Sequence, residues 1–435
     1  MSVCRNMHSL LSSCGRATSL STRIANCQGS KFLQQTTRWS ALRILQTCTS
    51  KRSVFNTTIS FCQKQEDSSS KHGHSVSEEQ PQQSEKHQAC HKLRSWSFNV
   101  DSFGKIVIQT QFNAIVKPVS PLEYPAADKA FITLTMKSKE KDDSLFETVT
   151  NSLQANAGYE DEQLFVAVHF LENIVDELKK RDASVTWLAE VPISFNADIQ
   201  TSDHGTILLE NLENQRCVIK SEHGNCHINK IKSGDVKITS LSGNIICKKV
   251  LQGNAEITTH GAGSITTGRL QGQTFLLSSE AGDINCNDVY TVKAGIKTTS
   301  GHIEFANVHG ECDIETDEGN VDVGSLDGSL NAVTNTGNIS TYLVRHKEVN
   351  ISSQNGDISL KVPSDVKTGV YLEASTVSVS KELHTQSVEE NHSSDRVVYS
   401  GAWGNEANNQ LKAVTKQGGI TVAVQSWFDS LKLTK

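Results

Sequence analysis

A glycine recurs at nearly constant spacing through the second half of the chain, and this repeat limits the possible folds more than any other feature. "SGNIICKKV" (242–250) and "AGDINCNDV" (281–289) are two copies of one phrase. The aligned glycines, at steps of 18 to 20 residues and with a tenth after an interruption, are Gly205, Gly224, Gly243, Gly263, Gly282, Gly301, Gly319, Gly337, Gly356 and Gly418. A period near twenty predicts a solenoid, because each unit can bury itself only against its neighbours.

Apolar residues occupy fixed positions relative to each glycine. Nearly every repeat has Ile or Val two places after the glycine, and further apolar residues follow at four and seven places, as in Ile284, Cys286 and Val289. An alternation of period two predicts short β-strands with one face inward. We therefore expect an all-β fold, a single elongated parallel β-helix of about ten coils with two short strands per coil.

The positions around the glycine are small and polar. We expect the glycine to supply the positive φ of a tight corner, which also suits the Asn or Asp that often follows it. Ser or Thr stands three places before nine of the ten glycines, where a hydroxyl can satisfy backbone groups. His260 is the exception, in the one repeat of twenty residues.

The first 65 residues differ in composition from the rest. They contain nine Lys and Arg residues, no Asp or Glu, and many Ser and Thr residues. This composition is typical of a mitochondrial transit peptide, and a disordered basic tail is the alternative. Without these residues the net charge falls from −6 to −15, because nine positive charges leave. An acidic mature protein, which we expect in the mitochondrial matrix, argues against nucleic acid as a partner.

The composition also predicts the domain organisation. No apolar run reaches the roughly 18 residues that cross a bilayer, so we expect no transmembrane segment. We expect a transit peptide at 1–65, a disordered linker at 66–92, a strand-rich capping region at 93–183, the solenoid at 184–427 with a loop near 382–395, and a capping tail at 428–435.

The cysteines follow the repeat. Of the eleven, five lie in residues 1–65 and one in the linker, and the other five occupy inward positions: Cys217, Cys226, Cys247, Cys286 and Cys312. Cys247 and Cys286 share a column but lie two coils apart, about 9–10 Å, which is too far for a disulfide. We interpret all five as small core residues in a reducing compartment.

The coil pattern is similar to a known domain family. The "[ST]xxG[DN]I" coil, opened by "EVPISFNADIQTSDHG" (190–205) and closed by "AVTKQGGITVAVQSW" (413–427), resembles the putative-adhesin domain of unknown function, widespread in bacteria. The resemblance covers 184–427 and implies a parallel β-helix. The ending "QSWFDSLKL" (425–433) more narrowly resembles the vertebrate family with sequence similarity 185, which implies mitochondrial residence. Neither resemblance brings catalytic residues.

The segment 163–180 is left open between helix and strand. "QLFVAVHFLENIVDELKK" has apolar residues at helical spacing, whereas the family implies a strand near its start.

Two histidines are the one candidate site. His204 and His223 precede the glycines of adjacent coils, so we expect them side by side, with Asp203, Glu222 and His227 nearby. Such a cluster suits a metal or acid–base site, and solvated corner histidines are the alternative. We expect no other catalytic or metal-binding residue and no cofactor.

Two classes of function remain. One is a non-catalytic binding or scaffold module, a stiff rod that engages a protein partner. The other is a carbohydrate-active or other enzyme, which would gather carboxylates and basic residues on one exposed strand face. The outward positions are mixed, and the sequence shows no nucleophile–base pair, nucleotide loop or metal spacing, which favours binding.

The tail is more apolar than a free terminus requires. A solenoid exposes core side chains and strand edges at both ends. We expect Trp427, Phe428, Leu431 and Leu433 to cover one end as helical turns and residues 95–136 to cover the other, leaving a monomer. For the tail, a docking peptide is the alternative.

Overall fold

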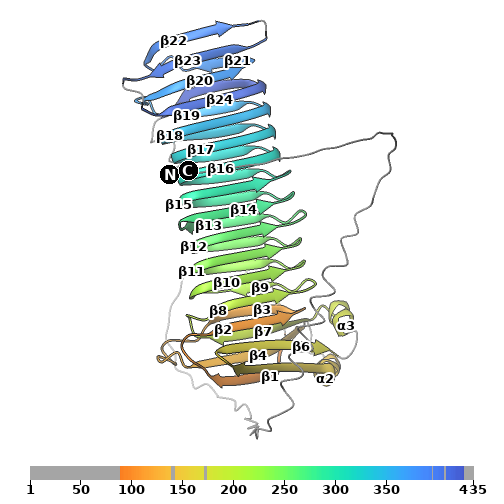
Figure 1. Ribbon diagram of the computed structural model, residues 1–435. Helices are drawn as coiled ribbons and strands as arrows, with labels where there is room; N and C mark the ends of the chain where they lie inside the picture. Colours follow the sequence, from red (N-terminus) through yellow and green to blue (C-terminus); the bar gives the residue numbers. More distant parts are fainter. Residues whose placement is uncertain (1–88, 139–142, 171–173, 394, 406–407, 426–435) are drawn as a thin grey trace, which may run out of the picture. The chain divides into compact units, whose positions relative to one another are not determined.

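The computed structural model describes residues 89–138, 143–170, 174–393, 395–405 and 408–425, all within the compact unit Gln83–Lys435 (Figure 1). The transit peptide, most of the linker and the capping tail predicted above lie outside the described residues. Among those described, no helix is both long enough and apolar enough to span a membrane.

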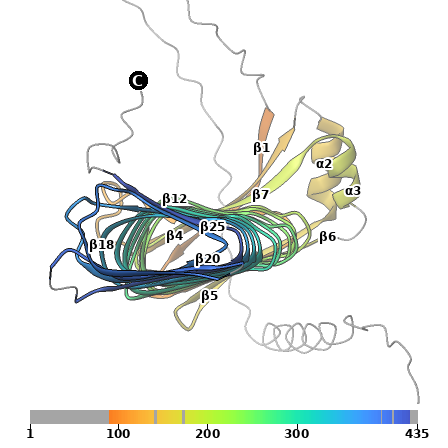
Figure 2. The same cartoon turned by 90° about the horizontal axis from the view of Figure 1, so that it is seen from above.

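The described chain is a stack of parallel coils that contribute strands to two facing sheets. Seen along the stack, the coils superpose as flattened ovals (Figure 2). The central strands are β8 (Asn196–Thr201), β9 (Ile207–Leu209), β10 (Leu212–Ser221), β11 (Cys226–Ser240), β12 (Ile245–Thr259), β13 (Ile265–Gln271), β14 (Thr274–Ser279), β15 (Ile284–Thr298), β16 (Ile303–Glu318), β17 (Val321–Thr336) and β18 (Ile339–Asn355). The predicted parallel β-helix is confirmed.

The core lies between the two sheets and consists of the predicted inward columns. Ile245, Ile265, Ile284 and Ile303 pair in register from coil to coil, and each is almost completely buried. Gly418 continues the glycine column after the interruption, because β24 (Gln410–Gln417) and β25 (Gly419–Val424) pair in parallel with β18 and β19 (Ile358–Val362).

Polar side chains complete each corner. The Gly243 amide donates to the Ser240 hydroxyl at 2.8 Å, which confirms the role predicted for the Ser/Thr column. After the glycine, the Asn244 amide donates to the side-chain oxygen of Asn225 one coil earlier, at 2.9 Å. In the twenty-residue repeat Thr259 takes the buried position, so that the extra residue leaves the column intact.

Close approach of the backbone, not a positive φ, explains the glycine column, and this corrects our expectation. A Cβ at Gly243 would lie 2.0 Å from the carbonyl oxygen of Gly224 in the preceding coil. The next seven column glycines would meet the equivalent oxygen at 1.9–2.7 Å. Only three of the ten have a positive φ, at 154–159°: Gly319, Gly337 and Gly418.

A second glycine column, overlooked in the sequence, lies at the opposite corner. There Gly253 and Gly310 have φ of 129° and 123°, which L-residues rarely adopt. A Cβ at Gly253 would also lie 1.7 Å from the Ser233 carbonyl oxygen.

The solenoid begins earlier than predicted. β2 (Lys105–Thr110) and β3 (Asn113–Pro118) form a complete coil that pairs in parallel with β8 and β9. β6 (Gln163–Phe170) and β7 (Ser184–Val191) pair with the other edges of β2 and β3. The boundary at 184 is therefore wrong, because the inward residues of β2 and β3 continue the core columns.

Antiparallel strands close this first end. β1 (Ala89–Asn99) pairs with β4 (Lys129–Ser138), which pairs with β7, while β5 (Leu153–Glu160) pairs with β6. The segment 163–180 contains both a strand, β6, and a helix, α3 (Ile174–Lys180), next to α2 (Asp143–Ser152) in Figure 2.

The second end is built in the same way. β20 (Thr368–Ala374) and β21 (Thr376–Val379) pair with β24 and β25, so the chain reaches the end coil before it returns to fill the coil beneath. The expected loop near 382–395 contains a strand instead, since β22 (Thr385–His392) forms an antiparallel hairpin with β23 (Val397–Trp403). Trp403 is fully buried there and donates to the Tyr399 hydroxyl at 3.0 Å.

Replacing a column glycine should destabilise the solenoid far more than replacing a glycine outside the column. We expect Gly243→Ala to cost about 2–4 kcal/mol, because its Cβ would push neighbouring coils apart. Gly295→Ala is the control, since its Cβ would meet only the flexible end of Leu276, at 3.1 Å, and it should change stability by about 0.5 kcal/mol or less. Urea unfolding measures both; equal midpoints would contradict the close-contact explanation.

Candidate functional site

The structure brings His204 and His223 together, as predicted, but at an exposed corner. Their ring centroids are 5.4 Å apart. His223 Nδ1 lies 2.8 Å from the Ser242 hydroxyl, and His204 Nε2 lies 3.6 Å from Asp203. The other carboxylate oxygen of Asp203 accepts from Lys179 at 3.0 Å, and this hydrogen bond lowers the pKa of Asp203. Within the described ranges, no three His, Cys, Asp or Glu residues are grouped to hold a metal ion.

The five solenoid cysteines are free and buried, as the inward columns require. Cys247 and Cys286 stand on either side of Thr267 in one column. Burial raises the pKa of the Cys217 and Cys286 thiols to about 12. These groups are therefore neutral thiols that serve as core side chains rather than nucleophiles.

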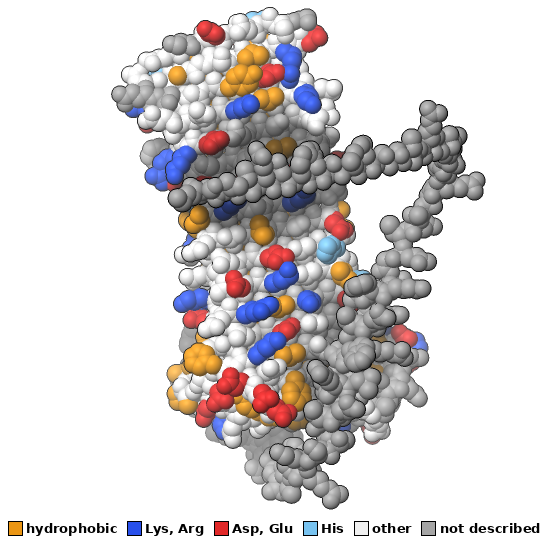
Figure 3. All heavy atoms as spheres, viewed as in Figure 1, with side chains coloured by type: hydrophobic (Ala, Val, Ile, Leu, Met, Phe, Trp, Pro, Cys, Tyr) orange, Lys and Arg blue, Asp and Glu red, His pale blue; other side chains and the backbone are white. Residues whose placement is uncertain are grey.

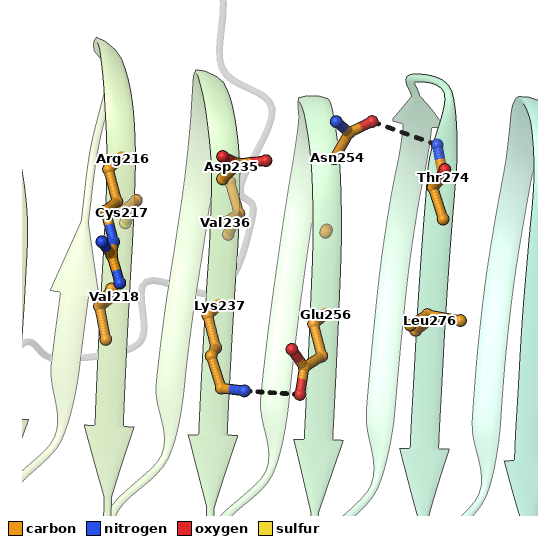
Figure 4. A pocket seen from close by; sticks show the side chains of 11 residues that line it. Arg216, Cys217, Val218, Asp235, Val236, Lys237, Asn254, Glu256, Thr274 and Leu276 are labelled. Carbon is orange, nitrogen blue, oxygen red and sulfur yellow. Dashed lines mark hydrogen bonds and ion pairs between the residues drawn. The ribbon is translucent and has the colours of Figure 1, made fainter.

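A shallow hollow lies on the outer face of one sheet, where β10, β11, β12 and β14 run side by side (Figure 4). Its volume is about 450 Å³, and its lining includes Arg216, Asp235, Lys237, Glu256 and Leu276. The Lys237 ammonium and the Glu256 carboxylate form an ion pair of 2.7 Å across neighbouring strands. Alternating charges thus hold one another in place on this face.

Exposed apolar side chains extend this hollow towards the next coil. Leu276 is 52% exposed, although it stands between the buried residues Phe275 and Leu277. A second hollow of about 580 Å³ at the adjoining corner shares Asn254 with the first and is lined by Tyr290 and Val292. Val292 is 67% exposed. We call the two hollows together the central face.

The aromatic ring at this corner is held by its neighbours. Tyr290 stacks on His309 with centroids 4.6 Å apart and an interplanar angle of 5°, and the Arg269 guanidinium lies 5.6 Å from the Tyr290 centroid. Arg269 also pairs with Asp288 at 3.4 Å. The central face is therefore a fixed surface with an apolar middle and a charged margin, which suits binding better than acid–base chemistry.

The sequence did not lead us to Leu276, Tyr290 or Val292 as surface residues, although the strand alternation predicts an outward Leu276. In "TFLLSS" the alternation that places Phe275 and Leu277 inward places Leu276 outward, in the column of Lys237 and Glu256.

Comparison with known proteins agrees with the repeat pattern. Residues 242–423 match the model of the family Toastrack DUF4097. These residues are therefore similar to the Toastrack family. The match is shorter than the span 184–427 expected from the resemblance, although the same coils continue before residue 242. The matched residues include most of the central face.

Solved structures give distant similarities. A putative adhesin from Parabacteroides distasonis is 12% identical, with 63% of this chain and 98% of that one covered and a TM-score of 0.36. A protein from the same species described as a putative lipid binding protein is 12% identical, covering 76% and 96%, with a TM-score of 0.31. A putative adhesin from Bacteroides fragilis is 14% identical, covering 62% and 96%, with a TM-score of 0.28. Scores this low give no information on ligands.

The core thiols should be inaccessible in the folded protein. We expect Cys217, Cys226, Cys247, Cys286 and Cys312 to resist a thiol-specific alkylating reagent at pH 8 and to react after unfolding, whereas exposed Cys90 should react at once. The folded pKa of Cys217 is raised from 9.0 to about 12, so this group should favour folding fully below pH 9 and progressively less as pH rises towards 12. Mass spectrometry locates the label, and fast native labelling of a core thiol would contradict their burial.

Proposed function

We propose that this protein is a non-catalytic binding module whose central face engages a protein partner. The observation that supports it is the exposed apolar group of Leu276, Tyr290 and Val292 on a rigid sheet, bordered by charges that are already paired. Contiguous exposed apolar side chains with a polar rim are typical of protein interaction sites. The similarity of residues 242–423 to the Toastrack family and the prediction of a scaffold from the sequence support this function.

The proposal includes a monomer with closed ends. Both ends of the stack carry antiparallel strands, and the outermost strand β22 contains Glu389 and Glu390. Charged edge strands disfavour the end-to-end pairing of sheets.

The central-face proposal is tested by affinity capture from mitochondrial extract. We expect the double variant Leu276→Lys, Val292→Lys to lose its captured partner by about tenfold or more, because charge would replace the apolar middle of the interface. Val333→Lys is the matched control, since Val333 is outward and 37% exposed on the same sheet but lies outside the central face. Equal capture by the two variants, both with unchanged melting temperatures, would contradict the proposal.

We also propose that the protein resides in mitochondria, in the matrix. The acid-free, basic composition of residues 1–65 supports this proposal, together with the similarity of "QSWFDSLKL" to the vertebrate family with sequence similarity 185. We expect cleavage before Glu66. Microscopy of a C-terminally tagged protein and N-terminal sequencing of its mature form provide the test. Diffuse cytosolic signal with an intact Met1 would exclude import.

A further inference from the structure

Three loops meet at one side of the first coils. They are residues 101–104, 119–128 and 192–195, and we call them the end loops. The Ser102 hydroxyl donates to the Ala126 carbonyl at 3.1 Å, and the Ser194 hydroxyl donates to the Ser102 carbonyl. The Val119 amide donates to the Val191 carbonyl at 2.9 Å. These bonds join loops that are far apart in the sequence into one surface.

Each end loop presents an apolar side chain to solvent. Leu122 is 94% exposed, Phe103 72% and Ile193 42%. In the space-filling view, hydrophobic side chains gather at the lower left, at this end of the stack, with carboxylates beside them (Figure 3). Exposed apolar residues that converge from separate loops indicate a surface that is buried in a complex.

The charged residues of the end loops are all acidic. The end loops contain Asp101, Glu123 and Asp128 and no Lys or Arg. The turn Glu160–Asp161–Glu162 adds three exposed carboxylates and adjoins the first loop, because the Lys105 amide donates to the Glu162 carbonyl at 2.9 Å and the Tyr159 hydroxyl donates to Asp101 at 3.0 Å.

The neighbouring lysines do not neutralise this surface. The Lys105 ammonium pairs with Asp198 at 2.8 Å, and the Lys129 ammonium donates to the Asn99 side chain. Lys105 is thus paired with a carboxylate outside the end loops, whereas Lys129 keeps its positive charge next to Asp128. The six carboxylates of the end loops and the adjoining turn outnumber these two neighbouring lysines and leave the surface acidic.

We propose that the end loops bind a basic, amphipathic segment of a partner protein. Leu122, Phe103 and Ile193 would contact its apolar face, while the surrounding carboxylates would pair with its Lys and Arg side chains. An anionic membrane or a nucleic acid is disfavoured by the same charge. This site shares no residue with the central face, so it stands independently of the function proposed there.

The probe is a labelled synthetic 18-residue peptide with Arg and Leu at helical spacing, titrated into the full chain and followed by fluorescence anisotropy. We expect saturable binding that weakens as salt is added, because salt screens exposed charges. A peptide with Glu in place of Arg should not bind. Saturable binding of that acidic peptide, or no binding of the basic one, would overturn the proposal.

Variants locate the site. The double variant Phe103→Ser, Leu122→Ser should weaken binding by about tenfold or more. Leu241→Ser is its control, because Leu241 is 46% exposed at a distant corner. The triple variant Glu160→Gln, Asp161→Asn, Glu162→Gln should weaken binding and its salt dependence, whereas Glu311→Gln, Asp317→Asn, Glu318→Gln should not.

Two outcomes would reject the assignment. One is equal weakening by the end-loop variants and their controls at unchanged melting temperature, which would mean non-specific attraction to an acidic protein. The other is binding of the full chain to neutral phosphatidylcholine vesicles that is lost in Phe103→Ser, Leu122→Ser while peptide binding persists, which would make the loops a lipid contact.

Discussion

The contact between one glycine and the carbonyl oxygen of the glycine before it controls the geometry of the stack. Strands of successive coils can exchange backbone hydrogen bonds only if the corners approach as closely as the strands do. At Gly282 the space for a Cβ lies 1.9 Å from the Gly263 oxygen, so any side chain there would separate the coils. The Ser/Thr and Asn ladders depend on this spacing, since the Asn338 amide reaches the Asn320 side chain at 2.8 Å only when the corners superpose.

The central coils could be predicted from the sequence, whereas the ends could not. Between Gly205 and Gly356 each coil contacts the next one in sequence, so a local period describes the structure completely. At both ends the order of the coils in space differs from their order in the sequence. The β2–β3 coil lies between the β6–β7 coil and the β8–β9 coil. The β24–β25 coil lies between the strands β18 and β19 on one side and β20 and β21 on the other. This intercalation of one coil between two others removes the constant spacing in the sequence. β2 and β3 are joined by a short turn, whereas α3 interrupts the β6–β7 coil. The intercalation also ties each end coil to two neighbours that are distant in sequence, which opposes fraying.

The surface features divide in the same way, into those that follow from a local sequence pattern and those that depend on the order of the coils in space. The pairing of His204 with His223 followed from their position before two successive glycines, and the structure places their rings beside each other. The outward direction of Leu276 also follows from local alternation. By contrast, Phe103, Leu122 and Ile193 lie on three connections whose meeting depends on intercalation. No local pattern in the sequence could place them together.

A stack of this kind favours recognition by fixed side chains. Several of its outward charges are bonded from coil to coil, as Lys297 is to Glu315 at 3.0 Å, so these paired charges add little further attraction for a partner. Its backbone is held by hydrogen bonds on both sides of nearly every strand, which lowers the entropy that binding must remove. Specificity then falls to the few positions where an apolar side chain interrupts the paired charges. Each such position has a defined coil and column. A partner therefore recognises both the spacing of these side chains along the stack and their chemistry.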